Sequence, residues 1–150
     1  MEAQLVENVK HVVLGIDTGA GAIKAFTAGR GVQLPSQVAA DGARLQSGEA
    51  EGLEQVQPPT HVSTASGDFW VGTGAHRWGR PLESLDHSRF RGSPGMAALL
   101  YGALERHVQQ YGTALARVEK AYVGLPQQAV GIPGLVEDVQ RWLTGTHVWQ

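Results

Sequence analysis

A glycine-rich bend directly after an apolar run limits what this chain of 150 residues can fold into. Residues 11–29 read HVVLGIDTGAGAIKAFTAG, and the run at residues 10–16 is rich in β-branched side chains, which favours a buried strand. Residues 22–27 are followed by Gly29 and Gly31, so a helix starting there would end within two turns. The segment therefore predicts a β-hairpin rather than a strand followed by a helix.

The bend does not match the two common glycine-rich nucleotide loops. A dinucleotide-binding loop needs G-x-G-x-x-G at the start of a helix, and Lys24 stands where the third glycine would be. The motif G-x-x-x-x-G-K-[ST] is absent, because no Ser or Thr follows Lys24. Neither of these nucleotide folds is expected here.

Two interpretations of the bend remain open from the residues alone. In the first, backbone N–H groups of small residues converge on a phosphate, Asp17 holds a hydrated Mg²⁺ and Lys24 supplies a mobile positive charge. In the second, the glycines only provide positive φ angles for a tight hairpin, Asp17 caps its own turn and Lys24 is solvated. The local pattern does not decide between them.

The remaining patterns predict further strands and two amphipathic helices. Strands are expected at residues 32–39, where Pro35 marks an edge, a bulge or a break, in a hairpin at residues 61–72, and at residues 118–126. A helix is expected at residues 94–111, with Ser93 as its N-cap, Pro94 at its first position and Gly112 at its end. The polar, acidic residues 41–60 predict an exposed loop.

The last part of the chain predicts a helix followed by a strand. Apolar residues recur at helical spacing over residues 135–143, and residues 146–150 have the composition of a strand. Trp149 either docks onto the sheet or is covered by structure further along the chain, and we expect the latter. The whole pattern indicates a mixed α/β layer with one open sheet edge or face that is left for a partner.

Composition excludes several classes of function. The length fits one domain over residues 1–150, and 12 Lys and Arg against 14 Asp and Glu give no electrostatic case for direct nucleic-acid binding. No cysteine is present, no apolar run approaches a membrane span, and the N-terminus lacks a signal-peptide pattern, so a cytoplasmic protein without a membrane partner is expected. The six histidines are scattered and G-x-S-x-G is absent, which argues against a histidine metal site and a catalytic triad.

Arginine and aromatic residues are interleaved in one segment. Residues 76–92 contain four arginines together with Trp78 and Phe90. Because arginine and aromatic residues are enriched at interfaces, the segment is a candidate filament or partner contact. The alternative is a solvated loop whose arginine stems lie along the surface.

Several short motifs, taken in order, resemble a known family. They are LGIDTGAGAIKAF, LPSQVA, FWVGTGA, YVGLPQQAV and LVEDVQRWLTGTHVW. In this order they resemble segments of the actin-like ATPases, and most closely the plasmid-segregation actins of the ParM/StbA type and their archaeal relatives. The resemblance covers about the whole chain. It implies an α/β, ribonuclease-H-like half-fold, with a mixed sheet, flanking helices and an inserted hairpin, as an actin-like N-terminal domain that is incomplete relative to the family.

The resemblance also implies a cofactor and its ligands. In the family, ATP or GTP binds with Mg²⁺ in a cleft between two facing halves. The carried-over phosphate-binding residues are Asp17, Thr18, Gly19, Ala20, Gly21 and Lys24. Asp17 would hold Mg²⁺ through water, Gly19 to Gly21 would present backbone N–H groups, and Lys24 would be the cationic partner. Ala20 and Ala22 stand where relatives commonly place hydroxyl or amide side chains, which predicts weaker nucleotide binding.

The implied function is that of the half of a cytoskeletal, plasmid-segregating ATPase that carries the first phosphate loop. Its partners would be nucleotide, further copies in a filament, and a plasmid-partition adaptor. The second phosphate loop, the adenosine-binding segment and the water-orienting residue would lie beyond Gln150, so no catalytic residue and little or no ATPase activity are expected of this chain alone. A non-catalytic actin-like interaction module, or part of a sugar or acid kinase, are the alternatives.

Overall fold

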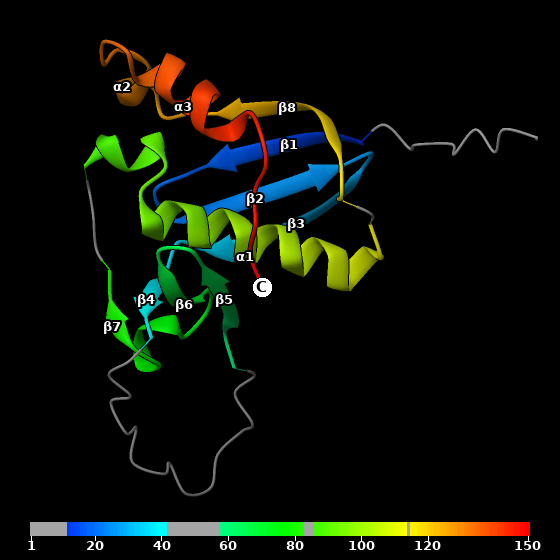
Figure 1. Cartoon of the computed structure of the whole chain (residues 1–150), viewed down its shortest axis with the longest axis vertical. Coiled ribbons are helices and arrows are strands. Elements are labelled where there is room, and N and C mark those ends of the chain that lie inside the picture. The colour runs from blue at the N-terminus through cyan, green and yellow to red at the C-terminus, as the bar shows by residue number, and fades with distance from the viewer. Residues whose placement is uncertain (1–11, 42–57, 83–85, 114) are drawn as a thin grey trace, which may run out of the picture.

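The computed structural model describes residues 12–41, 58–82, 86–113 and 115–150. The elements in chain order are β1 (Val12–Thr18), β2 (Ala22–Thr27), β3 (Arg30–Pro35), β4 (Val38–Ala40), β5 (Thr60–Thr64), β6 (Gly67–Val71), the 3₁₀ helix η1 (Ala75–Arg77), β7 (Arg80–Pro81), the 3₁₀ helix η2 (His87–Arg91), α1 (Pro94–Tyr111), β8 (Val118–Gly124), α2 (Gln127–Val130) and α3 (Leu135–Leu143). They form two four-stranded sheets that share the long helix α1 (Figure 1).

The first sheet, sheet A, has the strand order β3-β2-β1-β8. β1 runs antiparallel to β2 and parallel to β8, so the carboxyl ends of β1 and β8 meet at one edge (Figure 1). The hairpin predicted around the glycine-rich bend is confirmed. The inward side chains, such as Leu14, Ile16 and Ile23, are buried in the core, whereas Phe26 and Tyr122 on the outer face are exposed.

The second sheet, sheet B, has the order β5-β6-β4-β7 and is antiparallel throughout. The hairpin predicted at residues 61–72 is confirmed as β5 and β6. The single strand predicted at residues 32–39 is instead two strands, since β3 ends at Pro35 in sheet A and β4 begins at Val38 in sheet B. Proline has no N–H to continue a ladder, so the chain leaves sheet A there, and the break is the correct alternative.

Helix α1 has the predicted bounds and the predicted caps. The Ser93 hydroxyl accepts a hydrogen bond from the N–H of Met96, and Gly112 ends the helix with a φ of 63°. α1 packs against both sheets, and Gly102 faces Val71 of sheet B. The helix therefore lies at the centre of the core. No helix in the described parts of the chain is both long and apolar enough to cross a membrane.

The strand predicted at residues 146–150 is wrong. After α3 the chain crosses α1 (Figure 1). There the Trp149 ring stacks on Tyr101 with centroids 4.6 Å apart, and its indole N–H donates to Glu105. The backbone of Gln150 exchanges two hydrogen bonds with that of Ser63. These contacts on α1 and β5 hold the segment away from sheet A, so β8 has no outer neighbour among the described residues. Trp149 thus docks on helix α1 and not on a sheet, and it remains partly exposed.

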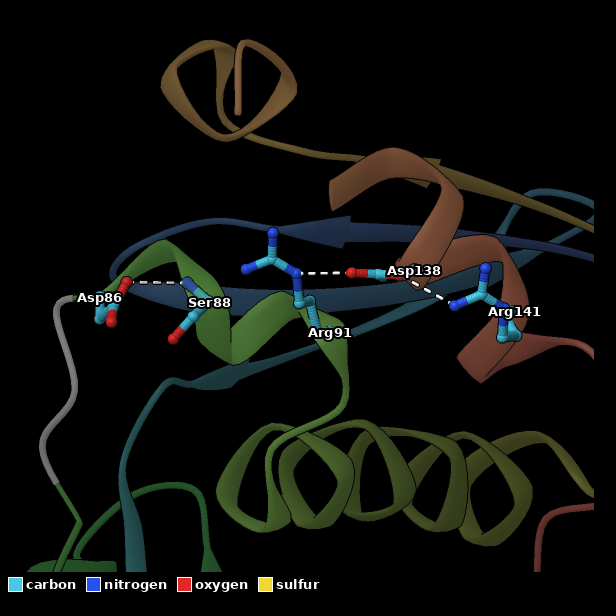
Figure 2. A network of polar contacts seen from close by, with 5 residues as sticks. All are labelled: Asp86, Ser88, Arg91, Asp138 and Arg141. Atoms are coloured by element: carbon cyan, nitrogen blue, oxygen red, sulfur yellow. Dashed lines mark hydrogen bonds and ion pairs between the residues drawn. The ribbon is translucent and has the colours of Figure 1, made fainter. Parts of the chain in front are cut away.

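An ion-pair network joins η2 to α3. Arg91 Nε donates to Asp138 Oδ2 over 2.7 Å, and Arg141 Nη1 lies 3.0 Å from Asp138 Oδ1 (Figure 2). At the start of η2, Asp86 accepts from the N–H of Ser88, and this hydrogen bond lowers the pKa of the Asp86 carboxyl. The cap is therefore fully present at neutral pH and is lost as the pH falls through that lowered pKa.

We expect the two arginines of this network to contribute unequally to stability. The Arg91 side chain is 35% exposed and that of Arg141 is 78% exposed, so solvent screens the second pair more strongly. A double-mutant cycle on Arg91→Ala and Asp138→Ala should give a coupling of about 0.5–1 kcal/mol in urea unfolding. The Arg141→Ala cycle should give a coupling near zero, and equal couplings would contradict this.

Candidate functional site

The bend between β1 and β2 is closed by one backbone hydrogen bond. The N–H of Gly19 donates to the carbonyl of Ala22 over 3.0 Å, with Ala20 and Gly21 between them. Neither Gly19 nor Gly21 has a positive φ, so the hairpin does not need glycine for that reason. A Cβ placed on Gly21 would meet nothing within 4 Å, so packing among the described residues does not require glycine there either. The small size of Gly21 leaves room for a group from outside.

The two amides at the tip of the bend are open. The N–H groups of Ala20 and Gly21 have no acceptor within the described segments, and both residues are exposed. Two carbonyls of the bend are bonded to Ser36, whose N–H donates to the Gly21 carbonyl over 3.0 Å and whose hydroxyl donates to the Gly19 carbonyl over 3.4 Å. The bend thus offers two of the three predicted amides, since that of Gly19 is already bonded.

Asp17 and Lys24 face each other across the hairpin. The register pairs them directly, the Lys24 Nζ lies 3.9 Å from Asp17 Oδ2, and their side chains are 50% and 53% exposed for Lys24 and Asp17 respectively. An exposed pair of this kind contributes about 0–1 kcal/mol to folding. Both charges therefore remain accessible to a ligand at little cost in stability.

Thr18 lies on the opposite face of β1 from Asp17. Its side chain is buried, and its hydroxyl donates to the carbonyl of Gly124 over 2.8 Å. The side chain thus ties the end of β1 to the end of β8. The structure brings Asp17, Lys24 and the bend together. The Thr18 hydroxyl, in contrast, is buried on the opposite face of β1 and does not join them.

Two residues near the bend were not singled out from the sequence. Gly124 is paired with Asp17 in the parallel ladder, and a Cβ on it would lie 3.3 Å from Asp17 Oδ1, so glycine keeps space beside the carboxylate. Ser36 holds the bend carbonyls. The segments LPSQVA and YVGLPQQAV contain these residues, but their contact with the bend depends on strand pairing between distant parts of the chain.

The described residues also form an open groove away from the bend. A groove of about 820 Å³ lies between β8, α1, α3 and the C-terminal residues, and side chains such as Leu104, Val123 and Val139 line it. It opens on the inner face of sheet A, whereas Asp17 and Lys24 lie on the outer face. None of the predicted phosphate-binding residues lines this groove.

One histidine does lie among potential metal ligands. Ligand atoms of Asp41, His61 and Asp68 are within 4.8 Å of one another on the outer face of sheet B. His61 Nε2 lies 3.4 Å from Asp41 Oδ2, and the Ser63 hydroxyl donates to Asp68. The exposed side chains are thus already paired with protein groups.

The arginine and aromatic segment divides between core and surface. Phe90 is 2% exposed, and the Trp78 ring packs at 4.9 Å from that of Trp70. Arg91 is held by Asp138, whereas Arg77 and Arg80 are exposed. The aromatic members therefore serve packing, and a contact surface here would be formed mainly by arginines.

Known proteins share this fold. The family model described as "Actin like proteins N terminal domain" matches residues 15–150. The crystal structure of apo psk41 ParM aligns with a TM-score of 0.61 and 12% identity, over 93% of this chain and 44% of that chain. ParM from the 15-stranded Clostridium botulinum filament aligns with a TM-score of 0.54 and 17% identity, over 88% of this chain and 38% of that chain. The chain thus spans less than half the length of either ParM. No curated protein matches it.

Proposed function

Because this chain belongs to the actin-like proteins, through their N-terminal domain at residues 15–150, we propose that it is the half of a ParM-type nucleotide-binding ATPase that carries the first phosphate loop. One observation carries the proposal: the β1–β2 bend has two open amides next to an accessible carboxylate and an accessible ammonium. The bend lies at the carboxyl ends of β1 and β8, the edge where open α/β sheets bind ligands.

Each residue of the bend has a chemical part in this proposal. The amides of Ala20 and Gly21 donate to phosphate oxygens, as backbone N–H groups do in anion-binding concavities. Lys24 moves from Asp17 toward the phosphates as a point charge. Asp17 repels phosphate but suits a hydrated Mg²⁺, which keeps several waters and needs few carboxylates, and Gly124 leaves room for that shell. When bound, the Mg²⁺ neutralises charge on the phosphates.

Little or no ATP hydrolysis is expected from the 150-residue chain itself. Phosphoryl transfer needs positioned donors, a metal and a held water around the terminal phosphate, and the bend supplies donors on one side only. Phosphate release from the purified chain should stay at the rate of buffer with Mg²⁺ and ATP. Steady release that is lost in Asp17→Ala would overturn this prediction.

Self-association, a plasmid-partition adaptor and a cytoplasmic location complete the proposal. The similar Clostridium botulinum protein is a ParM in a filament, which supports the assembly of copies of this chain.

A non-catalytic interaction module is the second candidate function. It is favoured by the unpaired edge of β8 within the described structure and by the exposed outer face of sheet A, where Tyr122 is 62% exposed and Phe26 is 49% exposed. Thermal unfolding separates the candidates, because a ligand that binds only the folded state raises the melting temperature. We expect ATP with Mg²⁺ to raise it by several degrees. No shift at millimolar ATP would favour the module.

A further inference from the structure

Ser36 contacts the bend from the short link between the two sheets. The link consists of Ser36 and Gln37, between the end of β3 and the start of β4. The Ser36 N–H donates to the Gly21 carbonyl, and its hydroxyl donates to the Gly19 carbonyl. Ser36 thus binds both carbonyls that flank Ala20 and Gly21.

Holding a carbonyl also fixes the direction of an amide. In a planar trans peptide, the C=O of one residue and the N–H of the next point in opposite directions. When Ser36 holds the Gly19 carbonyl, the N–H of Ala20 is therefore directed away from Ser36. Glycine adopts many backbone conformations, so without this contact the peptide between Gly19 and Ala20 rotates more freely.

The same link is fastened to sheet B by the next residue. The Gln37 carbonyl accepts from the N–H of Gly72 over 2.9 Å, and Gln37 Oε1 accepts from the N–H of Gly74 over 3.2 Å. Both glycines lie in the turn between β6 and η1. The link therefore connects the bend of sheet A with a turn of sheet B.

We propose that Ser36 is a positioning residue that orients the Ala20 amide for phosphate, and that Gln37 anchors it to sheet B. This role rests on the proposed function, since Ser36 acts through the bend and need not touch the ligand. By holding the Ala20 amide in place before the ligand binds, Ser36 removes the entropy cost of ordering this amide from the free energy of binding.

The first test uses the chain without nucleotide. Backbone ¹⁵N relaxation should show a lower order parameter for the Ala20 amide in Ser36→Ala than in the wild type, while Ser36→Thr keeps the hydroxyl and the order. Ser66→Ala, in the exposed β5–β6 turn, is the matched control and should leave Ala20 unchanged. An Ala20 order parameter in Ser36→Ala equal to that of the wild type would overturn the proposal.

The anchor to sheet B has its own variant. Gln37→Ala removes the acceptor of the Gly74 N–H, so amide exchange at Gly74 should accelerate and the order of Ala20 should fall. An unchanged Ala20 in this variant would overturn the anchoring role of Gln37.

The second test measures ATP binding with Mg²⁺ by calorimetry. Ser36→Ala should weaken binding about three- to tenfold, the range for loss of one hydrogen bond, and Ser36→Thr should restore it. The melting temperature of the free variant should stay within about 2 °C of the wild type, because the lost bond is exposed. If Ser36→Ala binds as tightly as the wild type, the positioning role is wrong. If the wild type does not bind ATP, the proposed function fails, and the relaxation test still decides whether Ser36 orders the bend.

Discussion

Asp17→Asn is expected to remove the magnesium-dependent part of ATP binding. The substitution keeps the size of the side chain and removes its charge, so the hydrated Mg²⁺ loses its carboxylate. Groups that hold a metal through an intermediate ligand typically contribute 10–100-fold to metal affinity, and we expect a loss of about that size in calorimetry with ATP and Mg²⁺. Without Mg²⁺ the substitution should not weaken ATP binding. The variant has lost the negative charge that repels the phosphates, so it should bind ATP as tightly as the wild type or more tightly.

A matched variant separates this local effect from a change in overall charge. Glu137→Gln removes an exposed carboxylate on α3, away from the bend, and should leave both titrations unchanged. Equal losses for Asp17→Asn with and without Mg²⁺ would show that Asp17 supports the shape of the bend instead of the metal.

Gly102→Ala is expected to destabilise the fold, although the same change usually stabilises a helix. In a helix interior, replacing glycine by alanine usually stabilises the helix by about 1 kcal/mol. Here, a Cβ on Gly102 would lie 2.1 Å from Val71 Cγ2, and Val71 is fully buried in sheet B. Relief of such an overlap moves α1 away from β6, and overpacking a core typically lowers the free energy of unfolding by about 1–3 kcal/mol. Urea unfolding of Gly102→Ala should therefore show a free energy of unfolding that is lower than that of the wild type by about this amount.

Two further variants test whether the contact with Val71 is the cause. Gly95→Ala is the matched control in the same helix, because its Cβ would meet Leu82 at an ordinary 3.6 Å, and it should be neutral or slightly stabilising. Val71→Ala makes room opposite Gly102, so adding Gly102→Ala to it should cost less than adding it to the wild type. A Gly102→Ala chain as stable as the wild type would contradict the close packing of α1 on sheet B.

The parts of the fold that could be predicted are those set by nearby residues. Gly29 stops any helix after the bend, and Ser93 with Gly112 caps α1, so these elements have signals within a few positions of their ends. The orientation of Thr18 also had a local signal. Strand side chains alternate, so Thr18 shares the buried face of Ile16.

The parts that could not be predicted depend on partners far along the chain. Trp149 leaves the expected strand because Tyr101 offers a ring to stack on, and nothing next to Trp149 indicates this partner. Likewise, Ser36 and Gly124 reach the bend only through strand pairing. The charges of Asp17 and Lys24 could be read from the sequence. It could not be predicted that the N–H of Gly19 would be occupied by a hydrogen bond to the carbonyl of Ala22.

We propose, above all, that the amides at the tip of the β1–β2 bend receive the phosphates of a nucleotide. A titration of the ¹⁵N-labelled chain with ATP and Mg²⁺, followed by amide shifts, tests it directly. We expect the largest shifts at Ala20 and Gly21 and a smaller one at Gly19, whose N–H is already bonded. Adenosine, which has no phosphate, should cause no shift at the bend. Unchanged bend amides, or shifts confined to the groove beside β8, would contradict it.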